Sequence, residues 1–251
     1  MTRRLIFFAG LGLLAILLPD VLYAQAPEAL NIDIDSFLGP GKFSQTINLL
    51  LTLSSISLIP FFLVSVTSFL RTVIVLSMIR QALQTQQAPP NSVIVALSLF
   101  LTIFVMTPTW NEINVKAVQP YKEGQISQKA AMKLGAEPIR KFMLNFTREK
   151  DLALFLEFSK LKRVQSYDSV PMFVIIPAFI ISELKTAFQI GFLLFIPFVV
   201  IDLIISNILL SLGMFMLSPA MVSLPFKILL FVLTDGWHLV IRGLLLSFRV
   251  V

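Results

Sequence analysis

Long runs of apolar residues alternate with shorter polar segments along this chain. The runs cover residues 46–69, 93–110, 171–200, 201–217 and 224–248, and the boundaries between the last three are soft. Runs of this length, without the alternation of strands, are typical of membrane helices, because lipid offers the backbone no hydrogen-bond partner. The pattern predicts an all-α integral membrane protein of helical hairpins, with about four hydrophobic segments that span the bilayer.

The beginning of the chain has the features of a cleaved secretory signal. Two arginines precede an apolar stretch at residues 5–18, and the small residue Ala24 precedes the expected cut. As a helix the stretch would span about 21 Å, which is short of the roughly 30 Å of hydrocarbon in a bilayer. We predict a signal peptide at 1–24 and a mature N-terminal segment at 25–43, with an uncleaved first anchor as the alternative.

The rest divides into three regions. Residues 44–110 are predicted to form a first hydrophobic hairpin, with turn residues in the section 71–91. Residues 111–170 are charged and amphipathic, which predicts a small insert of short helices. Residues 171–251 form the second hydrophobic hairpin region.

The side of the membrane on which the insert lies is predicted from two conflicting signals. Its Lys and Arg content favours the cytoplasm, whereas a cleaved signal followed by two crossings places it outside. The insert has about 60 residues, which is the upper limit for loops that follow the positive-inside rule. We therefore favour an extracytoplasmic position.

Within the insert, Ser127 is expected to cap a helix that stops near Gly135, and Pro138 to begin the next helix. Phe142 and Phe155 belong to apolar repeats at helical spacing. They predict a small local core, or alternatively an interface with another subunit.

The composition of the chain excludes most kinds of catalytic and metal-binding site. The chain is 57% hydrophobic and 14% charged, it has no cysteine, and it contains a single histidine. Disulfides and thiolate sites are excluded, and no zinc-protease motif or Gly-rich phosphate loop occurs. Basic residues are not interleaved with aromatic ones, so nucleic acid is not an expected partner. We predict no enzyme activity, no cofactor and no metal.

Ionisable residues inside the hydrophobic segments are the main functional signal. Each costs about 3 kcal/mol to insert, so such residues pair, meet a neighbouring helix or face a water-filled path. Glu183, which lies among apolar side chains, is predicted to contact a neighbouring subunit. The others are predicted to line a pore or to join helices; they are Lys185, Asp202, Lys227, Asp235 and Arg242.

Three spacings refine this prediction. Asp235, His238 and Arg242 share a helical face, where a structural hydrogen-bonded stripe is favoured over a proton relay. Ala187 and Gly191 lie on the Glu183 face at a spacing that allows close helix approach. Asn207 and Ser211 have the same spacing on what is expected to be the next helix.

A cluster of soft apolar residues follows the 201–217 run. Met214, Phe215 and Met216 lie between Gly213 and Pro219, which favours a loop. Such residues are adaptable enough to seal around an irregular cargo, although ordinary core packing is the alternative.

Several long motifs resemble the FliP/SctR family of type III export-gate proteins, collinearly over residues 44–247. The motifs are Phe69-Leu-Arg71, Arg80-Gln-Ala-Leu, Gln86-Gln-Ala-Pro-Pro90-Asn91, Pro177-Ala-Phe, Glu183-Leu-Lys-Thr-Ala-Phe-Gln-Ile-Gly191-Phe, Leu224-Pro225-Phe-Lys227 and Asp235-Gly-Trp237.

The resemblance implies a non-enzymatic core subunit of the flagellar export gate, which forms a conduit for unfolded flagellar subunits. It implies a homo-oligomer, a pentamer, in a helical pore complex with FliQ and FliR homologues, and contacts with FlhB, FlhA and the assembly factor FliO. It places the chain in the inner membrane at the flagellar basal body, with parts on the periplasmic side. In related proteins a Met-rich loop forms the pore gasket, which here corresponds to Met214, Phe215 and Met216.

Two alternatives remain at this point. The nearer is an SctR-type subunit of a virulence injectisome, and the more distant is a polytopic transporter or an intramembrane enzyme.

Overall fold

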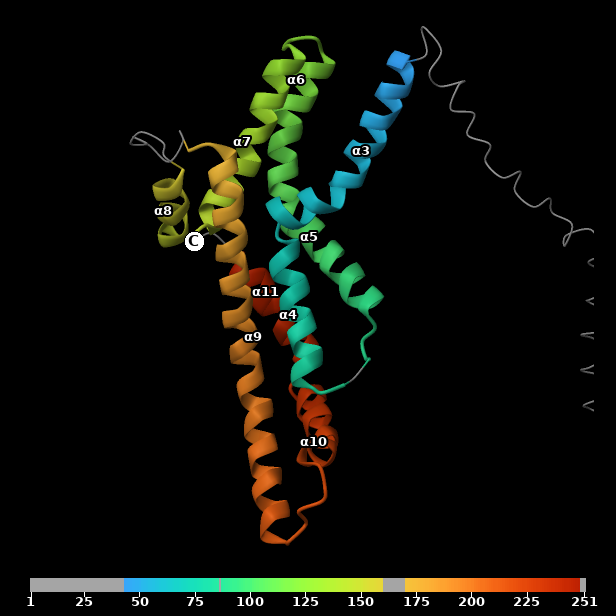
Figure 1. Cartoon of the computed structure of the whole chain (residues 1–251), viewed down its shortest axis with the longest axis vertical. Helices are drawn as coiled ribbons and strands as arrows, with labels where there is room; N and C mark the ends of the chain where they lie inside the picture. The colour runs from blue at the N-terminus through green and yellow to red at the C-terminus, as the bar shows by residue number, and fades with distance from the viewer. Residues whose placement is uncertain (1–42, 86, 160–169, 249–251) are drawn as a thin grey trace, which may run out of the picture. The chain divides into compact units, whose positions relative to one another are not determined.

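The computed structural model describes residues 43–85, 87–159 and 170–248, and every regular element in these ranges is a helix (Figure 1). This confirms the predicted all-α class. The predicted signal peptide, and the mature N-terminal segment as far as residue 42, lie outside the described residues.

In chain order, the described helices are α3 Phe43–Val66, α4 Phe69–Ala82, α5 Asn91–Ile113, the π-helix η1 Asn114–Val118, α6 Gln119–Lys122, α7 Gln128–Phe146, α8 Glu149–Phe158, α9 Met172–Ser211, α10 Pro219–Leu233 and α11 Gly236–Ser247.

Among the described residues, three segments are long and apolar enough to cross a membrane: Ile47–Val66, Asn91–Lys122 and Met172–Ser211. The α10 and α11 pair, bent by 64°, is a fourth candidate. The expected number of about four hydrophobic segments is therefore confirmed.

The chain divides into two compact units, Met1–Ser57 and Leu58–Val251. In the first unit only the beginning of α3 is described. The second unit contains all the packing discussed below.

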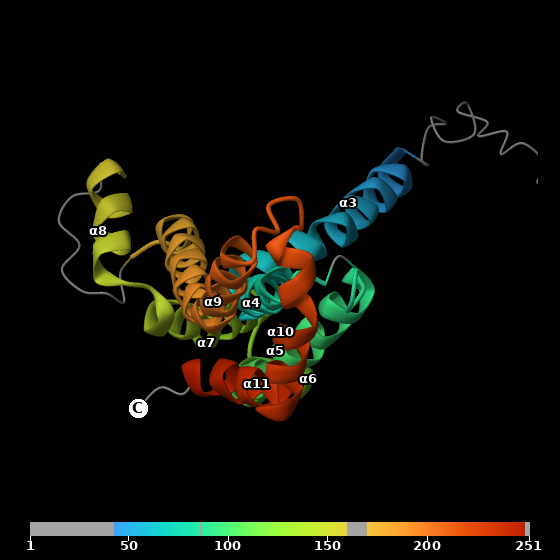
Figure 2. The same ribbon diagram turned by 90° about the horizontal axis from the view of Figure 1, so that it is seen from below.

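The centre of the second unit is the packing of α4 against α9, which lie side by side in both views (Figures 1 and 2). Val75, Leu76 and Ile79 of α4 are buried. A Cβ added at Gly191 of α9 would lie 2.1 Å from the Sδ of Met78, so the two helices approach closely where glycine leaves room.

This packing differs from the turn predicted for the section 71–91. Residues Phe69–Ala82 form a helix in the core, and the next helix begins at Asn91. The sequence could not show this because Arg71 and Arg80 suggested the end of a segment. Arg80 instead holds the turn, donating to the Asn91 Oδ1 at 2.6 Å.

Helix α9 is a single helix of 40 residues, although two segments were expected at 171–200 and 201–217. Pro197 lies inside it without ending it. Asn207 and Ser211 are therefore on the same helix as Ala187, and both are exposed, so no close helix approach occurs at that pair in the described structure.

The insert begins as predicted, since the Ser127 Oγ accepts a hydrogen bond from the Ala130 N–H at 3.3 Å. The helix does not stop near Gly135, because α7 continues through Pro138 to Phe146. The predicted local core exists, and it extends to the main body: the Phe142 ring lies 6.0 Å from the ring of Phe179 on α9.

Candidate functional site

Helix α9 ends in a backbone conformation that favours glycine. The Gly213 N–H bonds to the Leu210 carbonyl at 3.1 Å, and the Met214 N–H bonds to the Leu209 carbonyl at 2.9 Å. These two bonds form a Schellman motif, whose residue after the helix is left-handed. Gly213 has φ +73, so the loop turns away from the helix axis at this residue.

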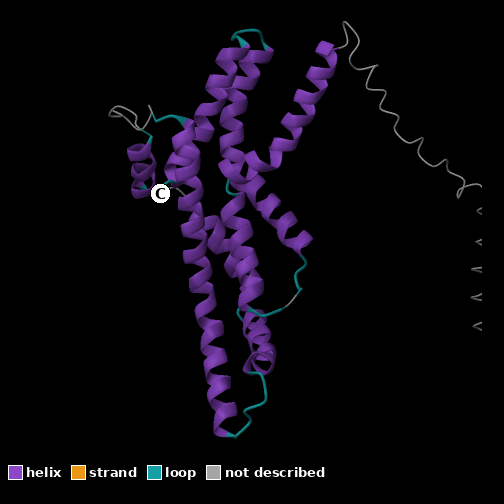
Figure 3. Cartoon of the chain, viewed as in Figure 1, coloured by secondary structure: helices purple, strands orange, loops and turns teal. Residues whose placement is uncertain are grey.

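The loop that follows carries the three residues predicted to form a seal, and Figure 3 shows it at the end of α9. Met214 is 46%, Phe215 77% and Met216 100% exposed. The structure therefore places the three side chains together in a loop, and they fill no core within the described chain.

A buried polar cluster joins the two helices that flank this loop. Lys227 of α10 pairs with Asp202 of α9 at 2.6 Å, and the Ser223 Oγ donates to the other oxygen of the same carboxylate at 2.5 Å. The Gln84 Nε2 donates to Asp202 from the end of α4, at 3.2 Å. Asp202 and Lys227 were predicted to line a pore or to join helices; within the described chain they connect α9 with α10.

The second buried charge pair joins Glu183 of α9 to Arg71 of α4. The Arg71 Nε donates to the Glu183 Oε2 at 2.9 Å, and the Arg71 Nη2 donates to the Glu183 Oε1. The Arg71 guanidinium also lies 3.9 Å from the ring centroid of Phe248, a cation–π distance.

The partner of Glu183 was not found from the sequence. Glu183 was assigned to a subunit interface because it had no evident partner, and this reason no longer holds, since Arg71 pairs with it inside the chain. The missed signal was Arg71 itself, which lies in an apolar helix and is subject to the same cost of insertion.

The insert is fixed to α9 by a third polar cluster. The Ser182 Oγ donates to the Asp151 Oδ2 at 2.7 Å and accepts from the Arg148 backbone N–H at 3.0 Å. The Arg148 Nη2 donates to the Gln189 Oε1 at 2.5 Å. This cluster was not predictable from the sequence, because its members are common polar residues with no distinctive spacing.

The two phenylalanines assigned as interface candidates lie on the insert. Phe142 is buried against Phe146 and Phe179, and Phe155 is half-buried in the same cluster. Phe142 thus contributes to the core of its own chain.

Lys185 lies on the exposed side of α9. Together with Phe188, Gln189, Phe192 and Leu193 it lines a shallow pocket of about 680 Å³. It points to the opposite side of the helix from Glu183, two residues earlier, which is buried.

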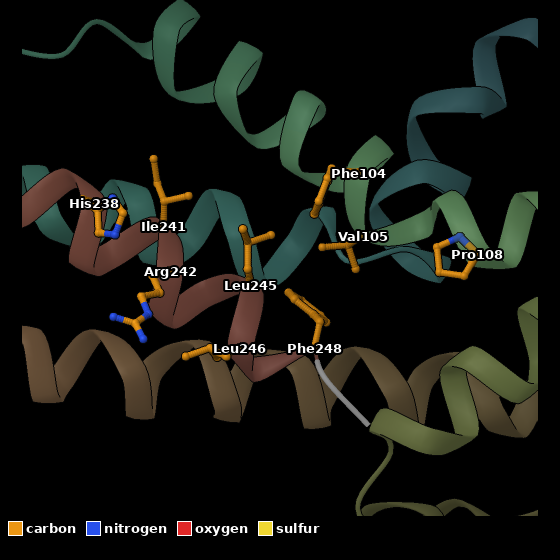
Figure 4. A pocket seen from close by; sticks show the side chains of 9 residues that line it. All are labelled: Phe104, Val105, Pro108, His238, Ile241, Arg242, Leu245, Leu246 and Phe248. Atoms are coloured by element: carbon orange, nitrogen blue, oxygen red, sulfur yellow. The ribbon is translucent and has the colours of Figure 1, made fainter. Parts of the chain in front are cut away.

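The stripe predicted on α11 is not formed. In residues 170–248, no hydrogen bond or ion pair joins the side chains of Asp235, His238 and Arg242. Asp235 instead precedes α11 in a left-handed conformation, with φ 50. His238 and Arg242 line a pocket of about 740 Å³ between α5 and α11 (Figure 4).

Comparisons with known proteins agree with one another. A model of the FliP family matches residues 51–244. The flagellar biosynthetic protein FliP of Bacillus subtilis (strain 168) is 51% identical over 217 residues, which cover 86% of this chain and 98% of the relative. The protein of the same name from Aquifex aeolicus (strain VF5) is 46% identical over 236 residues, covering 93% of this chain and 97% of the relative.

Proposed function

This chain belongs to the FliP family, a non-enzymatic component of the flagellar export apparatus, and from this membership we propose that it forms the export conduit itself. Its partners belong to the same apparatus. In the proposed assembly several copies, a pentamer, combine with FliQ and FliR homologues, and unfolded flagellar subunits pass through. FlhB, FlhA and the assembly factor FliO are further proposed partners.

The flagellar interpretation is preferred over the injectisome one because the relatives are flagellar proteins over most of their length. The chain is membrane-spanning. We place it in the inner membrane at the flagellar basal body, with the insert at 111–170 on the periplasmic side.

The observation that carries the proposal is the uncovered loop formed by Met214, Phe215 and Met216. A large apolar side chain exposed to water is costly, and a cluster of them marks a surface that meets another molecule. In a ring of copies these loops would face one another at the axis. They would then form an apolar constriction that excludes water while the conduit is idle.

The residue types suit a seal that opens for many different cargo residues. Met has three rotatable bonds and a polarizable sulfur, so Met214 and Met216 can repack around a passing chain. Phe215 adds bulk to the seal, since its ring buries a large apolar area with only two rotatable bonds.

The outer surface of α9 supports assembly with other protein. Large apolar side chains stay exposed over most of its length, among them Phe188, Phe192, Leu203 and Ile208. Lys185 and Asn207 interrupt this surface, and polar groups of this kind are better accommodated by neighbouring helices than by lipid.

Replacement of Met214, Phe215 and Met216 by alanine tests the proposal. The variant is expected to assemble with its partners and to leave the membrane permeable to small ions, with export reduced or unregulated. The matched control is Met132→Ala, which removes an exposed methionine from α7 of the insert. A triple variant that stays impermeable and exports normally would show that the loop is not the gate.

A further inference from the structure

We propose that neighbouring copies of this chain contact each other head to tail through α11. The corner between α10 and α11 of one copy, which ends in Asp235, enters the pocket between α5 and α11 of the next copy, where Arg242 receives the carboxylate. This inference rests on the proposed function, because it identifies residues at which the copies of the conduit would meet.

The receiving surface is the pocket of about 740 Å³. Phe104 and Pro108 of α5 and Leu245 of α11 contribute apolar walls, and Figure 4 shows them together with His238 and Arg242. Among the described residues no carboxylate lines the pocket, and the charged group that does is a cation. An occupant with an apolar body and one negative charge would match this surface.

Arg242 needs such an occupant. The side chain is exposed, and within the described residues it has no hydrogen bond or ion pair. It lies on one of the helices that form the bent candidate span. A guanidinium at an apolar surface is costly unless an anion neutralises it, and His238 one turn earlier adds a second polar group to the same rim.

The entering surface is the corner where α10 and α11 meet at 64°. Val232 is 68% and Leu233 75% exposed, so two aliphatic side chains at this corner are uncovered. Asp235 follows them closely, is exposed, and has no side-chain partner in the described part of the chain. The corner therefore combines an apolar body with one carboxylate.

Asp235 and Arg242 do not pair within one copy. Asp235 precedes the first residue of α11 and Arg242 lies in the middle of this helix, seven residues later, which is about 10 Å at the rise of an α-helix; no contact joins them in residues 170–248. Because Val232, Leu233 and Asp235 are not among the residues that line the pocket, each copy can use the corner and the pocket at once. A contact of this kind repeats from copy to copy and produces a ring or a helical assembly, as a conduit requires.

Cysteine cross-linking tests the contact, because the chain contains no native cysteine. The double variant D235C/R242C, in native membranes under mild oxidation, is expected to give a ladder of cross-linked oligomers. D235C alone and R242C alone are expected to give none. The matched control is D235C/K185C, since Lys185 is an exposed cation on α9 away from the pocket.

Reversal of the charges at positions 235 and 242 gives a second test, which measures oligomer yield and does not depend on disulfide geometry. R242D is expected to lower the oligomer yield about tenfold, because like charges would face each other, and D235R/R242D is expected to restore it. Restored assembly could not result from a general loss of folding. If the double variant assembles no better than R242D, the inference is overturned.

The remaining outcomes separate this inference from the proposed function. Normal oligomers of D235C/R242C without a ladder would overturn the head-to-tail contact and leave the conduit intact. Anionic phospholipid that copurifies with the wild-type chain and is lost in R242Q, again without a ladder, would assign the pocket to lipid. A wild-type chain that forms no oligomer in the membrane would overturn both.

Discussion

Arg71 and Glu183 are 112 residues apart in the chain and form a bidentate ion pair, in which the side chains are 3% and 0% exposed. The same guanidinium donates from its Nη1 to the Ser247 carbonyl and Oγ, at 2.9 and 3.0 Å. One cation thus connects α4, α9 and the end of α11. Helix α11 is therefore held to α4 and α9 by hydrogen bonds from a cationic side chain, in addition to apolar contacts.

Removing one member of this pair is predicted to cost more than removing both. Arg71→Met leaves the Glu183 carboxylate buried without its partner, which costs about 3–5 kcal/mol. The double variant R71M/E183M leaves no buried charge, so its stability should lie closer to that of the wild-type chain. Thermal unfolding in detergent measures both. If the losses of stability in Arg71→Met and in Glu183→Met simply add in the double variant, the pair is not coupled as described.

The Asp202 and Lys227 pair is predicted to respond asymmetrically. Asp202→Ala strands the Lys227 ammonium, whose side chain is only 1% exposed, and should cost about 3 kcal/mol or more. Lys227→Met leaves Asp202, which is 27% exposed and keeps the donors Ser223 and Gln84, and should cost only about 1 kcal/mol.

The control for this asymmetry is the exposed pair of Lys116 and Glu112 on adjacent turns, in which the lysine is 54% exposed. Lys116→Met should change the free energy of unfolding by less than about 1 kcal/mol. Equal losses of stability in Asp202→Ala and Lys227→Met would contradict the assignment of the larger cost to the more deeply buried charge.

The close approach of α4 and α9 can be tested by changing the size of the side chains at the contact between Gly191 and Met78. Gly191→Ala would place a methyl group 2.1 Å from the Met78 Sδ, so the methionine must move and the variant should lose about 1–3 kcal/mol. Met78→Ala removes the clashing atoms. The combination G191A/M78A should therefore be more stable than the sum of the two single changes predicts, as measured by thermal unfolding; an additive result would place the contact elsewhere.

Gly213 is predicted to matter for the position of the Met loop. Gly213→Ala imposes a side chain at φ +73 and should cost about 1 kcal/mol or more, whereas Gly213→Asn should be tolerated better because asparagine adopts this conformation more readily. Gly124 has the same φ in the insert. Gly124→Ala should lower stability by a similar amount without changing ion permeability. If ion permeability changes in Gly124→Ala as well as in Gly213→Ala and Gly213→Asn, Gly213 has no special role.

The class of fold was predictable because apolar run length and the lack of strand alternation are properties of single segments. Local rules also worked where one residue decides the outcome, as with the Ser127 cap and with Gly213 at the end of α9. The pairing of Arg71 with Glu183 and of Asp202 with Lys227 depends on which helices become neighbours. No spacing along the sequence contains that information.

The errors in helix boundaries have a common physical cause. Pro138 was expected to begin a helix and the 171–200 run to end before residue 201, yet α7 continues through Pro138 and α9 through Pro197 and beyond residue 200. Proline removes one backbone hydrogen bond, and packing against neighbouring helices outweighs this loss. The helix at Phe69–Ala82 was missed for a related reason, because the charges of Arg71 and Arg80 are satisfied by partners that only the folded chain brings near.

The length of α9 has a consequence for the lifetime of the newly made chain. Forty residues of helix extend for about 60 Å, twice the roughly 30 Å of hydrocarbon in a bilayer. In a free copy standing upright, about half of this helix would lie outside the hydrocarbon, and the apolar side chains that its own chain leaves exposed there would meet water or headgroups. Solitary copies should therefore be recognised and degraded quickly, and their half-life in the cell should rise when the other subunits of the apparatus are made at the same time.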